Sequence, residues 1–300
     1  MNYLDNYLRY LRIEKRASEH TIKSYALDLN QFDSYLKETY EIQEVQAIKA
    51  EQVRSWLVHL LMEKKTERTI NRKLSSLRAF FKFCIRRGWL EQDPSEAIDA
   101  LKQKKSLPRY VRSDHLDQLF DEVEFGDDFE GQRNRLMLEL LYLCGLRRSE
   151  LLGLDVDSFD AERLELRVMG KGGKERMIPL DRDLANKINA YVKLRYDKFG
   201  KKTDLPLFIL ENGNYIYPKF VYNLVKKHIN YVSTIEKASP HILRHSFATH
   251  MSNAGADILA LKELLGHSSL AATQIYTSNS IEILKEIHKK AHPLSEKKEK

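Results

Sequence analysis

The chain has 300 residues, 42% of them hydrophobic, which is enough for packed cores in about two domains. Its formal net charge of +7 favours a polyanionic partner, although charge alone is weak evidence for nucleic acid. The charged N-terminus excludes a signal peptide, and no apolar run reaches the roughly 18 residues of a membrane span. A cytoplasmic protein without a membrane partner is therefore expected.

The two cysteines, Cys84 and Cys144, lie far apart in the sequence, each beside apolar residues. This arrangement gives neither a disulfide framework nor the spacing of a metal site. It predicts inert core thiols in a reducing compartment. No metal and no cofactor are expected.

Residues 1–103 are expected to form an all-helical domain, because apolar residues recur at helical spacing and no strand alternation interrupts them. Ser18 is expected to cap the second helix, and Gly88 to follow the fourth. The four predicted helices contain residues 4–11, 22–36, 53–61 and 70–84.

The fourth of these helices is strongly basic, since Glu67 is the one acid among nine basic residues from Lys64 to Gly88. A run of charge is usually a solvated face. A face of one sign repels itself unless something anionic covers it, so contact with a DNA backbone is favoured here. The candidate DNA-binding residues are Arg68, Arg72, Lys73, Arg78, Lys82 and Arg86.

A domain boundary is expected within residues 93–113. Asp93 and Pro94 predict the start of a short helix, and residues 104–112 have the lysine, serine and proline content of a linker. A second domain is therefore expected over residues 113–300, with Ser113 capping its first helix.

The second domain is expected to be mostly helical with a small antiparallel sheet. Residues 133–144 predict a strongly apolar core helix that ends at Gly145, directly before Arg147. Residues 160–180 change to alternation, which predicts two strands joined by the turn Gly-Lys-Gly-Gly-Lys.

Three basic side chains belong to this predicted hairpin. Lys171 lies in the turn, from which it can reach into a site. Lys174 and Arg176 are interpreted as either DNA contacts or simply exposed residues, at even odds.

Residues 241–277 concentrate the side chains of phosphate chemistry. Arginine is a permanent bidentate partner for phosphate, histidine exchanges a proton near neutral pH, and tyrosine can attack phosphorus. Helices are predicted from Ser239 to Asn253, from Asp257 to Gly266, and around Tyr276. The candidate residues are His241, Arg244, His267 and Tyr276; His245 and His250 are interpreted as structural.

Four motifs now combine, in this order: CGLRRSELLGL around Arg147, VMGKGGKERMIPL around Lys171, SPHILRHSFATH around His241 and Arg244, and LLGHSSLAATQIYT around His267 and Tyr276. With them, after a basic helical region of fitting size, the chain resembles the tyrosine recombinases of the phage integrase family over essentially its whole length. Among these it looks like the Xer type, XerC and XerD. The first motif has Cys144 where many members carry threonine, a position that is not catalytic in the family.

The resemblance implies a SAM-like helical core-binding domain and a catalytic domain that close as a clamp around double-stranded DNA at a specific recombination site. It implies Tyr276 as the nucleophile of a 3′-phosphotyrosine intermediate and Arg147 and Arg244 as the phosphate-binding pair. Lys171 and the two candidate histidines would transfer protons and stabilise charge.

The resemblance also implies partners and a biological role. Copies of this chain, or of a homologous recombinase, would form a tetrameric synapse in which the C-terminal helix docks onto a neighbour. A DNA translocase is a possible activator. The reaction would resolve chromosome dimers at a dif-like site during cell division.

Three alternatives remain open. The first is an integrase of a phage or mobile element, disfavoured because helical periodicity begins by Tyr3 and leaves little room for an extra arm-binding domain. The second is a type IB topoisomerase, which the compact size of the chain and the sequences of the four motifs disfavour. The third is a catalytically inactive DNA-binding module, disfavoured because every catalytic position is filled.

Overall fold

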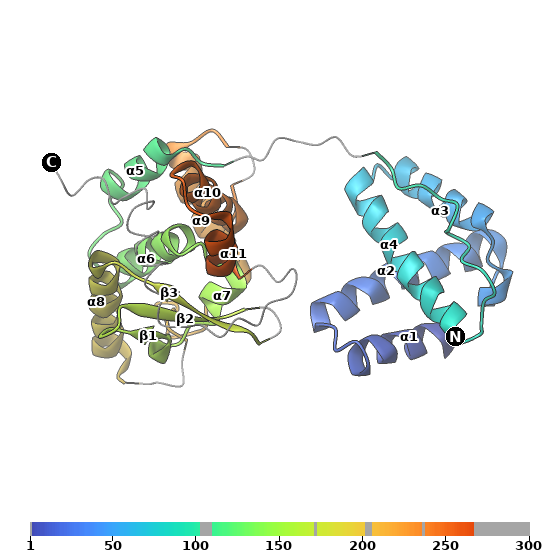
Figure 1. The fold of residues 1–300 in the computed structure, drawn as a ribbon, viewed down its shortest axis with the longest axis horizontal. Helices are drawn as coiled ribbons and strands as arrows, with labels where there is room; N and C mark the ends of the chain where they lie inside the picture. The colour runs from blue at the N-terminus through green and yellow to red at the C-terminus, as the bar shows by residue number, and fades with distance from the viewer. Residues whose placement is uncertain (1, 103–109, 171–172, 202–205, 236–237, 267–300) are drawn as a thin grey trace. The chain divides into compact units, whose positions relative to one another are not determined.

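The computed structural model describes residues 2–102, 110–170, 173–201, 206–235 and 238–266. The chain divides into two compact units, Met1–Ser106 and Leu107–Lys300. Both are mainly helical (Figure 1), as the sequence predicts. Among the described helices, none has the length and apolar character needed to cross a membrane.

The first unit is built from four long helices, as predicted. Ser18 caps the second of them by accepting a hydrogen bond from the amide of Thr21 (3.3 Å). Cys84 is buried in the core of this unit, as predicted, and burial raises the pKa of its thiol to about 12. The elements are α1 (Asn2–Ile13), α2 (Glu19–Tyr40), the short 3₁₀ helix η1 (Val45–Ala47), α3 (Ala50–Met62) and α4 (Glu67–Arg86).

The helix predicted at Asp93 and Pro94 is wrong. The backbone there makes a turn, because the carboxylate of Asp93 accepts bonds from the amide (2.8 Å) and hydroxyl (2.6 Å) of Ser95. A short aspartate side chain that bonds the backbone two residues on stabilises a turn in place of a helix.

A fully buried carboxylate, Asp28 of α2, joins α2 to the basic helix α4. Arg72 binds both of its oxygens, Lys73 donates to Oδ1 (3.0 Å), and the hydroxyl of Ser76 donates to Oδ2 (2.8 Å). Part of the positive charge of α4 is thus neutralised inside the protein. The expectation that an external anion covers this face is therefore wrong for Arg72 and Lys73.

We expect Asp28→Asn to lower the free energy of unfolding of the first unit by about 3–5 kcal/mol, because it leaves the buried Lys73 without its counter-charge. Both tryptophans, Trp56 and Trp89, belong to this unit, so fluorescence during urea unfolding reports on it.

The control for this prediction is Asp33→Asn, which removes a surface ion pair with Lys37 (2.9 Å) on the same helix. Both side chains of this pair reach solvent (43% and 26% exposed), and a surface pair contributes about 0–1 kcal/mol, so the control should unfold almost like the wild type. Equal unfolding of the two variants would contradict the buried role of Asp28.

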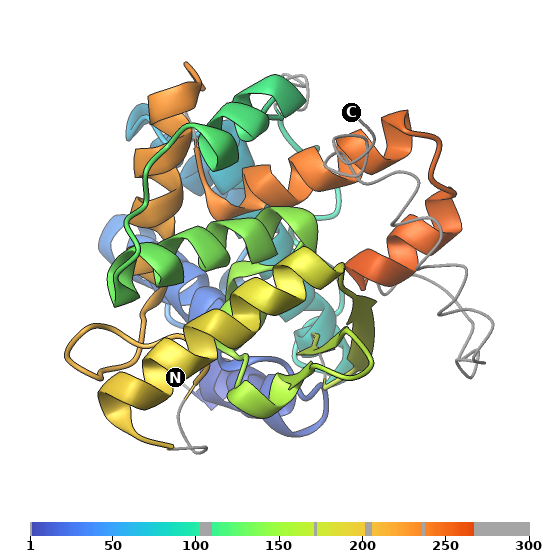
Figure 2. The ribbon, with the colours of Figure 1, turned by 90° about the vertical axis from the view of Figure 1, so that its left-hand side faces the viewer.

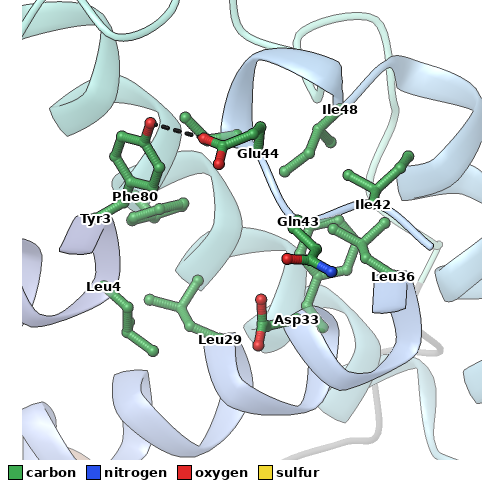
Figure 3. A pocket seen from close by; sticks show the side chains of 12 residues that line it. Tyr3, Leu4, Leu29, Asp33, Leu36, Ile42, Gln43, Glu44, Ile48 and Phe80 are labelled. Carbon is green, nitrogen blue, oxygen red and sulfur yellow. Dashed lines mark hydrogen bonds between the residues drawn. The ribbon is translucent and has the colours of Figure 1, made fainter. Parts of the chain in front are cut away.

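An apolar pocket in the first unit lies between α1, α2, the η1 segment and α4 (Figure 3). Leu4, Leu29 and Phe80 line it, and at its rim the hydroxyl of Tyr3 donates to Glu44 Oε2 (3.0 Å). None of the candidate catalytic or DNA-binding residues lines this pocket.

The second unit is organised around α6, which Asp128 caps by accepting from the amide of Gly131 (2.7 Å). Of its 15 residues, 11 are buried, as expected for a central helix. Helices α8 and α10 pack against it (Figures 1 and 2). The helices are α5 (Ser113–Asp121), α6 (Phe129–Leu143), α7 (Arg148–Leu152), the 3₁₀ helix η2 (Val156–Ser158), α8 (Arg182–Phe199), α9 (Pro218–Val232), α10 (Pro240–Asn253) and α11 (Ile258–Leu265).

The predicted hairpin is confirmed as β2 (Glu165–Met169) and β3 (Glu175–Pro179), which pair antiparallel. A two-residue strand, β1 (Phe159–Asp160), completes the sheet in the order β1-β2-β3. Strand β1 was not predicted, because two residues are too few to show alternation. At the turn, the amide of Gly170 donates to the carbonyl of Lys174 (2.7 Å).

Helix α5 begins one residue earlier than the predicted cap at Ser113 requires. Ser113 is its first helical residue, and Arg112 holds the cap position without a side-chain bond to the backbone of α5. The two helices predicted before His267 are present, with Asp257 capping α11 and Gly266 ending it at φ +62°.

Candidate active site

The candidate site forms where the start of α7, strand β3, α10 and the end of α11 meet. It contains two arginines that the sequence predicts, Arg147 and Arg244. It also contains a buried ion pair that was not expected from the sequence, Glu150 with Arg176. Distant segments of the second unit therefore supply one charged cluster.

Arg147 holds the cap position of α7. Its Nη1 donates to Glu150 Oε1 (2.6 Å), and its Nη2 donates to the carbonyl of Gly266 (3.2 Å). The preceding break needs glycine: Gly145 has φ +57°, and a Cβ there would lie 2.6 Å from Phe247 and 2.9 Å from Leu265. The predicted helix end at Gly145 thus sets the path of the chain into Arg147.

Arg244 is buried on α10. Its Nη1 donates to the carbonyl of Gly145 (2.6 Å), and its Nη2 donates to the carbonyl of Leu265. Burial, together with the neighbouring charge of Arg147, lowers its pKa to about 10, against the opposing effect of Glu150. Arg244 therefore stays cationic at neutral pH.

Glu150 also belongs to this cluster, although it was not predicted from the sequence. It occupies the third position of α7, where its Oε2 accepts from the backbone amide of Arg147 (2.9 Å). Burial acts to raise its pKa, but bonds from Arg176 and Arg147 lower it to about 2. A glutamate three residues after a helix cap is a known capping pattern, and this spacing could have identified it.

Both interpretations of Arg176, DNA contact and simple exposure, are wrong. The side chain is buried, and its Nη1 and Nη2 donate to the two oxygens of Glu150 (3.0 and 2.8 Å). Its Nε donates to the carbonyl of Leu264 (2.7 Å). Alternation along β3 places Arg176 on the buried face, and Glu150 makes its burial possible.

The last turn of α11 connects all three guanidinium groups. The carbonyls of Leu264, Leu265 and Gly266, three successive residues, accept from different arginines. Carbonyls at a helix C-terminus lack partners within the helix and carry partial negative charge, so cations stabilise them. The respective donors are Arg176, Arg244 and Arg147.

Together these four side chains carry three positive charges and one negative charge. The net charge of these four side chains is therefore +2, and it lies in a partly buried part of the protein. Such a cluster favours an anion that gains charge, as a phosphodiester does on the way to a five-coordinate transition state.

Within the residues that the structure describes, no contact joins the other predicted catalytic residues to this cluster. His241 lies on the first turn of α10 with an exposed side chain. Lys171, His267 and Tyr276 lie outside the described residues. Their roles stay predictions from the motifs.

Of the two histidines interpreted as structural, His250 has partners that fit this interpretation. Its Nδ1 lies 2.9 Å from the hydroxyl of Tyr142, and burial lowers its pKa. His245 is half-buried on α10.

The basic face of α4 divides into exposed and bound residues. Arg68, Lys82 and Arg86 are exposed, as is Lys174 of the hairpin turn, so phosphate contact by these four remains a prediction. Lys73 is buried against Asp28, so its predicted DNA contact is wrong. Arg72 is exposed at one side but binds the same carboxylate, and the half-buried Arg78 donates to the carbonyl of Ile98.

The low pKa of Glu150 predicts a pH-dependent stability. A carboxyl whose pKa falls from 4.5 to about 2 on folding contributes on the order of 3 kcal/mol above pH 4.5. This contribution is lost as the pH falls toward 2. The wild type should therefore exceed Glu150→Gln in stability at pH 7, and the difference should shrink below pH 4.5, measured by calorimetric unfolding.

The control for this pH dependence is Glu175→Gln, on an exposed glutamate of β3 that lies 4.0 Å from Arg167. A surface pair of this kind contributes little at any pH. A stability difference for Glu150→Gln that does not depend on pH would contradict the charge-based account.

Two family models match the chain. The Phage integrase family matches residues 109–282, and the Phage integrase, N-terminal SAM-like domain matches residues 4–88. Among curated proteins, the chain is 35% identical over 301 residues to Tyrosine recombinase XerC of Thermodesulfovibrio yellowstonii, covering 99% of this chain and 98% of that protein. It is 36% identical over 290 residues to Tyrosine recombinase XerC of Pseudomonas putida, covering 97% and 95%.

Solved structures share the fold. A XerH site-specific recombinase bound to a palindromic difH substrate matches with a TM-score of 0.71 and 24% identity, covering 95% of this chain and 83% of that one. The Tn1549 transposon integrase in complex with transposon right end DNA matches with a TM-score of 0.69 and 21% identity, covering 95% and 98%. The near full-length XerC relatives, the two family models and the paired arginines agree, and the chain belongs to the phage integrase family as a tyrosine recombinase of the Xer type.

Proposed function

We propose that this recombinase cuts and rejoins double-stranded DNA at a specific site, with Arg147 and Arg244 holding the scissile phosphate. The observation that carries the proposal is the juxtaposition of these two arginines on adjacent carbonyls at the end of α11. Each has N–H groups beyond those used in the contacts described above, and together with Arg176 and Glu150 they leave a net positive charge.

The reaction follows from this electrostatic arrangement. The phenolate oxygen of Tyr276 attacks phosphorus, the bond to the 5′-oxygen breaks, and a 3′-phosphotyrosine forms. The arginines stabilise the negative charge that develops on the non-bridging oxygens. Lys171 is the proposed acid for the 5′-oxygen, with His241 assisting deprotonation of the tyrosine and His267 bonding the phosphate.

The second half of the reaction reverses the first. The 5′-hydroxyl of a partner strand attacks the phosphotyrosine and releases Tyr276, so that one phosphodiester replaces another and no ATP is consumed. In this proposal residues 1–103 bind core DNA, residues 104–112 link the domains and residues 113–300 carry the chemistry.

The proposed biological role is resolution of chromosome dimers at a dif-like site by a cytoplasmic enzyme. The similarity to XerC proteins over 97–99% of this chain supports this role. A tetramer containing this chain or a homologous second recombinase would perform it, with the C-terminal helix docking onto a neighbour and a DNA translocase as activator.

Mapping of bound DNA in cells tests the role directly. A Tyr276→Phe protein should accumulate at one short chromosomal site, because binding without cleavage prevents turnover. Enrichment at many unrelated sites, or only at the ends of a mobile element, would contradict a role in dimer resolution.

We expect covalent cleavage to continue in excess EDTA. The two arginines supply the positive charge that metal ions supply in other phosphoryl-transfer sites. The measurement is adduct formation on a nicked DNA substrate with and without chelator. Cleavage that disappears with EDTA and returns with magnesium would contradict this mechanism.

We expect Arg68→Ala with Lys82→Ala to weaken DNA binding and its salt dependence. Each lost phosphate contact should reduce the slope of log affinity against log salt by roughly one. These two residues are chosen because both are exposed, whereas Arg72 holds the buried Asp28. Specific and random DNA should be affected alike, since backbone contacts carry no direct sequence information.

The control for the salt experiment removes two other exposed cations of the same unit, Arg12 and Lys37, each paired with a surface acid. The control should keep the wild-type slope. If the Arg68 and Lys82 variant keeps it too, the exposed face of α4 is merely solvated.

A further inference from the structure

We infer that Arg176 is a positioning residue: by occupying both oxygens of Glu150, it leaves Arg147 and Arg244 available to the scissile phosphate. The inference rests on the proposed function, because it assumes that these two arginines bind phosphate. It concerns a residue whose side chain is 5% exposed and which is therefore enclosed by protein.

In the described part of the second unit, Glu150 is the one carboxylate that pairs with Arg147, Arg176 and Arg244. Arg147 Nη1 lies 2.6 Å from its Oε1, and Arg244 Nη1 lies 3.7 Å from its Oε2. A buried carboxylate with an unfilled acceptor position draws in the nearest cation, because its desolvation is otherwise uncompensated. In this site the nearest cations are the two arginines that the reaction needs.

Arg176 reduces that competition, so that Arg147 keeps a single bond to Glu150 and Arg244 stays 3.7 Å away. Its fork meets both oxygens of Glu150, at 3.0 and 2.8 Å, in the bidentate geometry that is strongest between arginine and carboxylate. Its third contact, from Nε to the carbonyl of Leu264 at 2.7 Å, fixes the fork against the end of α11. Gly266 packs closely on Arg176, because a Cβ added at this glycine would lie 3.2 Å from Nη1.

The geometry separates two roles among three arginines. Arg176 directs three N–H groups at protein acceptors and is enclosed. Arg147, with a side chain 27% exposed, directs only one Nη at Glu150 and is open to an incoming anion. Loss of Arg176 would leave Glu150 competing with DNA for Arg147 and Arg244, which slows cleavage at bound DNA more than it weakens binding.

The experiment measures single-turnover formation of the covalent adduct on a nicked DNA substrate at saturating full-length protein. We expect Arg176→Met to cleave about 100-fold more slowly, with the Kd for site DNA changed less than about threefold. Arg167→Met, on an exposed arginine of the neighbouring strand β2, is the matched control and should cleave like the wild type.

A double variant separates this role from a merely structural one. Glu150→Gln combined with Arg176→Met removes the competing charge and its partner together, so it should recover at least about tenfold over Arg176→Met alone. Removal of both buried partners can also restore stability, so the rates are compared only among variants that circular dichroism shows to be folded at the assay temperature. A double variant as slow as the single variant, or Arg176→Met within about threefold of the wild type, would overturn the inference.

If Arg176→Met does not fold, as judged by circular dichroism, Arg176→Lys takes its place. One ammonium reaches a single oxygen of Glu150, so cleavage should fall about tenfold at an unchanged Kd. Wild-type cleavage by Arg176→Lys would overturn the inference. Absence of any adduct with wild-type protein would instead contradict the proposed function, so the two failures are distinguishable.

Discussion

Tyr276→Phe should abolish covalent attachment to DNA while leaving DNA binding nearly intact. The phenolic oxygen is the proposed nucleophile, and without it no phosphotyrosine can form. Phenylalanine keeps the ring and removes one oxygen, so little of the side chain's surface is lost. Incubation with a nicked substrate followed by a denaturing gel should show a protein–DNA band for wild type and none for the variant.

The control is Tyr222→Phe, on an exposed tyrosine of α9, which should form the adduct at the wild-type rate. Binding of Tyr276→Phe is measured separately by gel shift. A persisting adduct in Tyr276→Phe would disprove the assignment of the nucleophile, and with it the assignment of the motif LLGHSSLAATQIYT.

Arg244→Ala should lower the single-turnover cleavage rate by about 100- to 1,000-fold, the range found when one donor to a developing oxyanion is removed. The guanidinium is held by the carbonyls of Gly145 and Leu265, so its position before the reaction is fixed. Arg244→Lys should recover little, because lysine presents one charged nitrogen where arginine presents a planar fork.

Stability must be separated from catalysis here, because Arg244 also joins α10 to α11. Thermal unfolding of each variant identifies protein that is folded at the assay temperature. The control is Arg163→Ala, whose exposed side chain lies 3.8 Å from Asp160 at the surface, and it should cleave like the wild type. An Arg244→Ala protein that is folded and fully active would exclude Arg244 from the phosphate-binding pair.

The local sequence was sufficient for most of the helices and for the hairpin. Ser18 and Asp257 cap helices as predicted, Gly145 and Gly266 end them, and alternation places β2 and β3 correctly. These features depend on interactions within a few residues, so they can be read from spacing. The error at Asp93 has the same origin, since a local side-chain bond produces a turn that competes with a helix.

Charge patterns proved less informative than helical periodicity. Lys73 and Arg176 look like exposed cations in the sequence, yet both are buried against carboxylates distant in the chain, Asp28 and Glu150. The partners are 45 and 26 residues apart in the chain, so no local sequence pattern predicts these pairs. Exposed and buried basic residues can therefore be distinguished only after the chain is folded.

By itself the sequence determined the mainly helical class, the central helix, the hairpin and the family, whose motifs also nominate Arg147 and Arg244. Only the tertiary structure decided that these arginines share the end of α11, that Glu150 lies near both of them and that Arg176 pairs with Glu150. The physical reason is that the site joins α7, β3, α10 and α11 through buried charges. The favourable energy of such charges comes from partners that the sequence places far away.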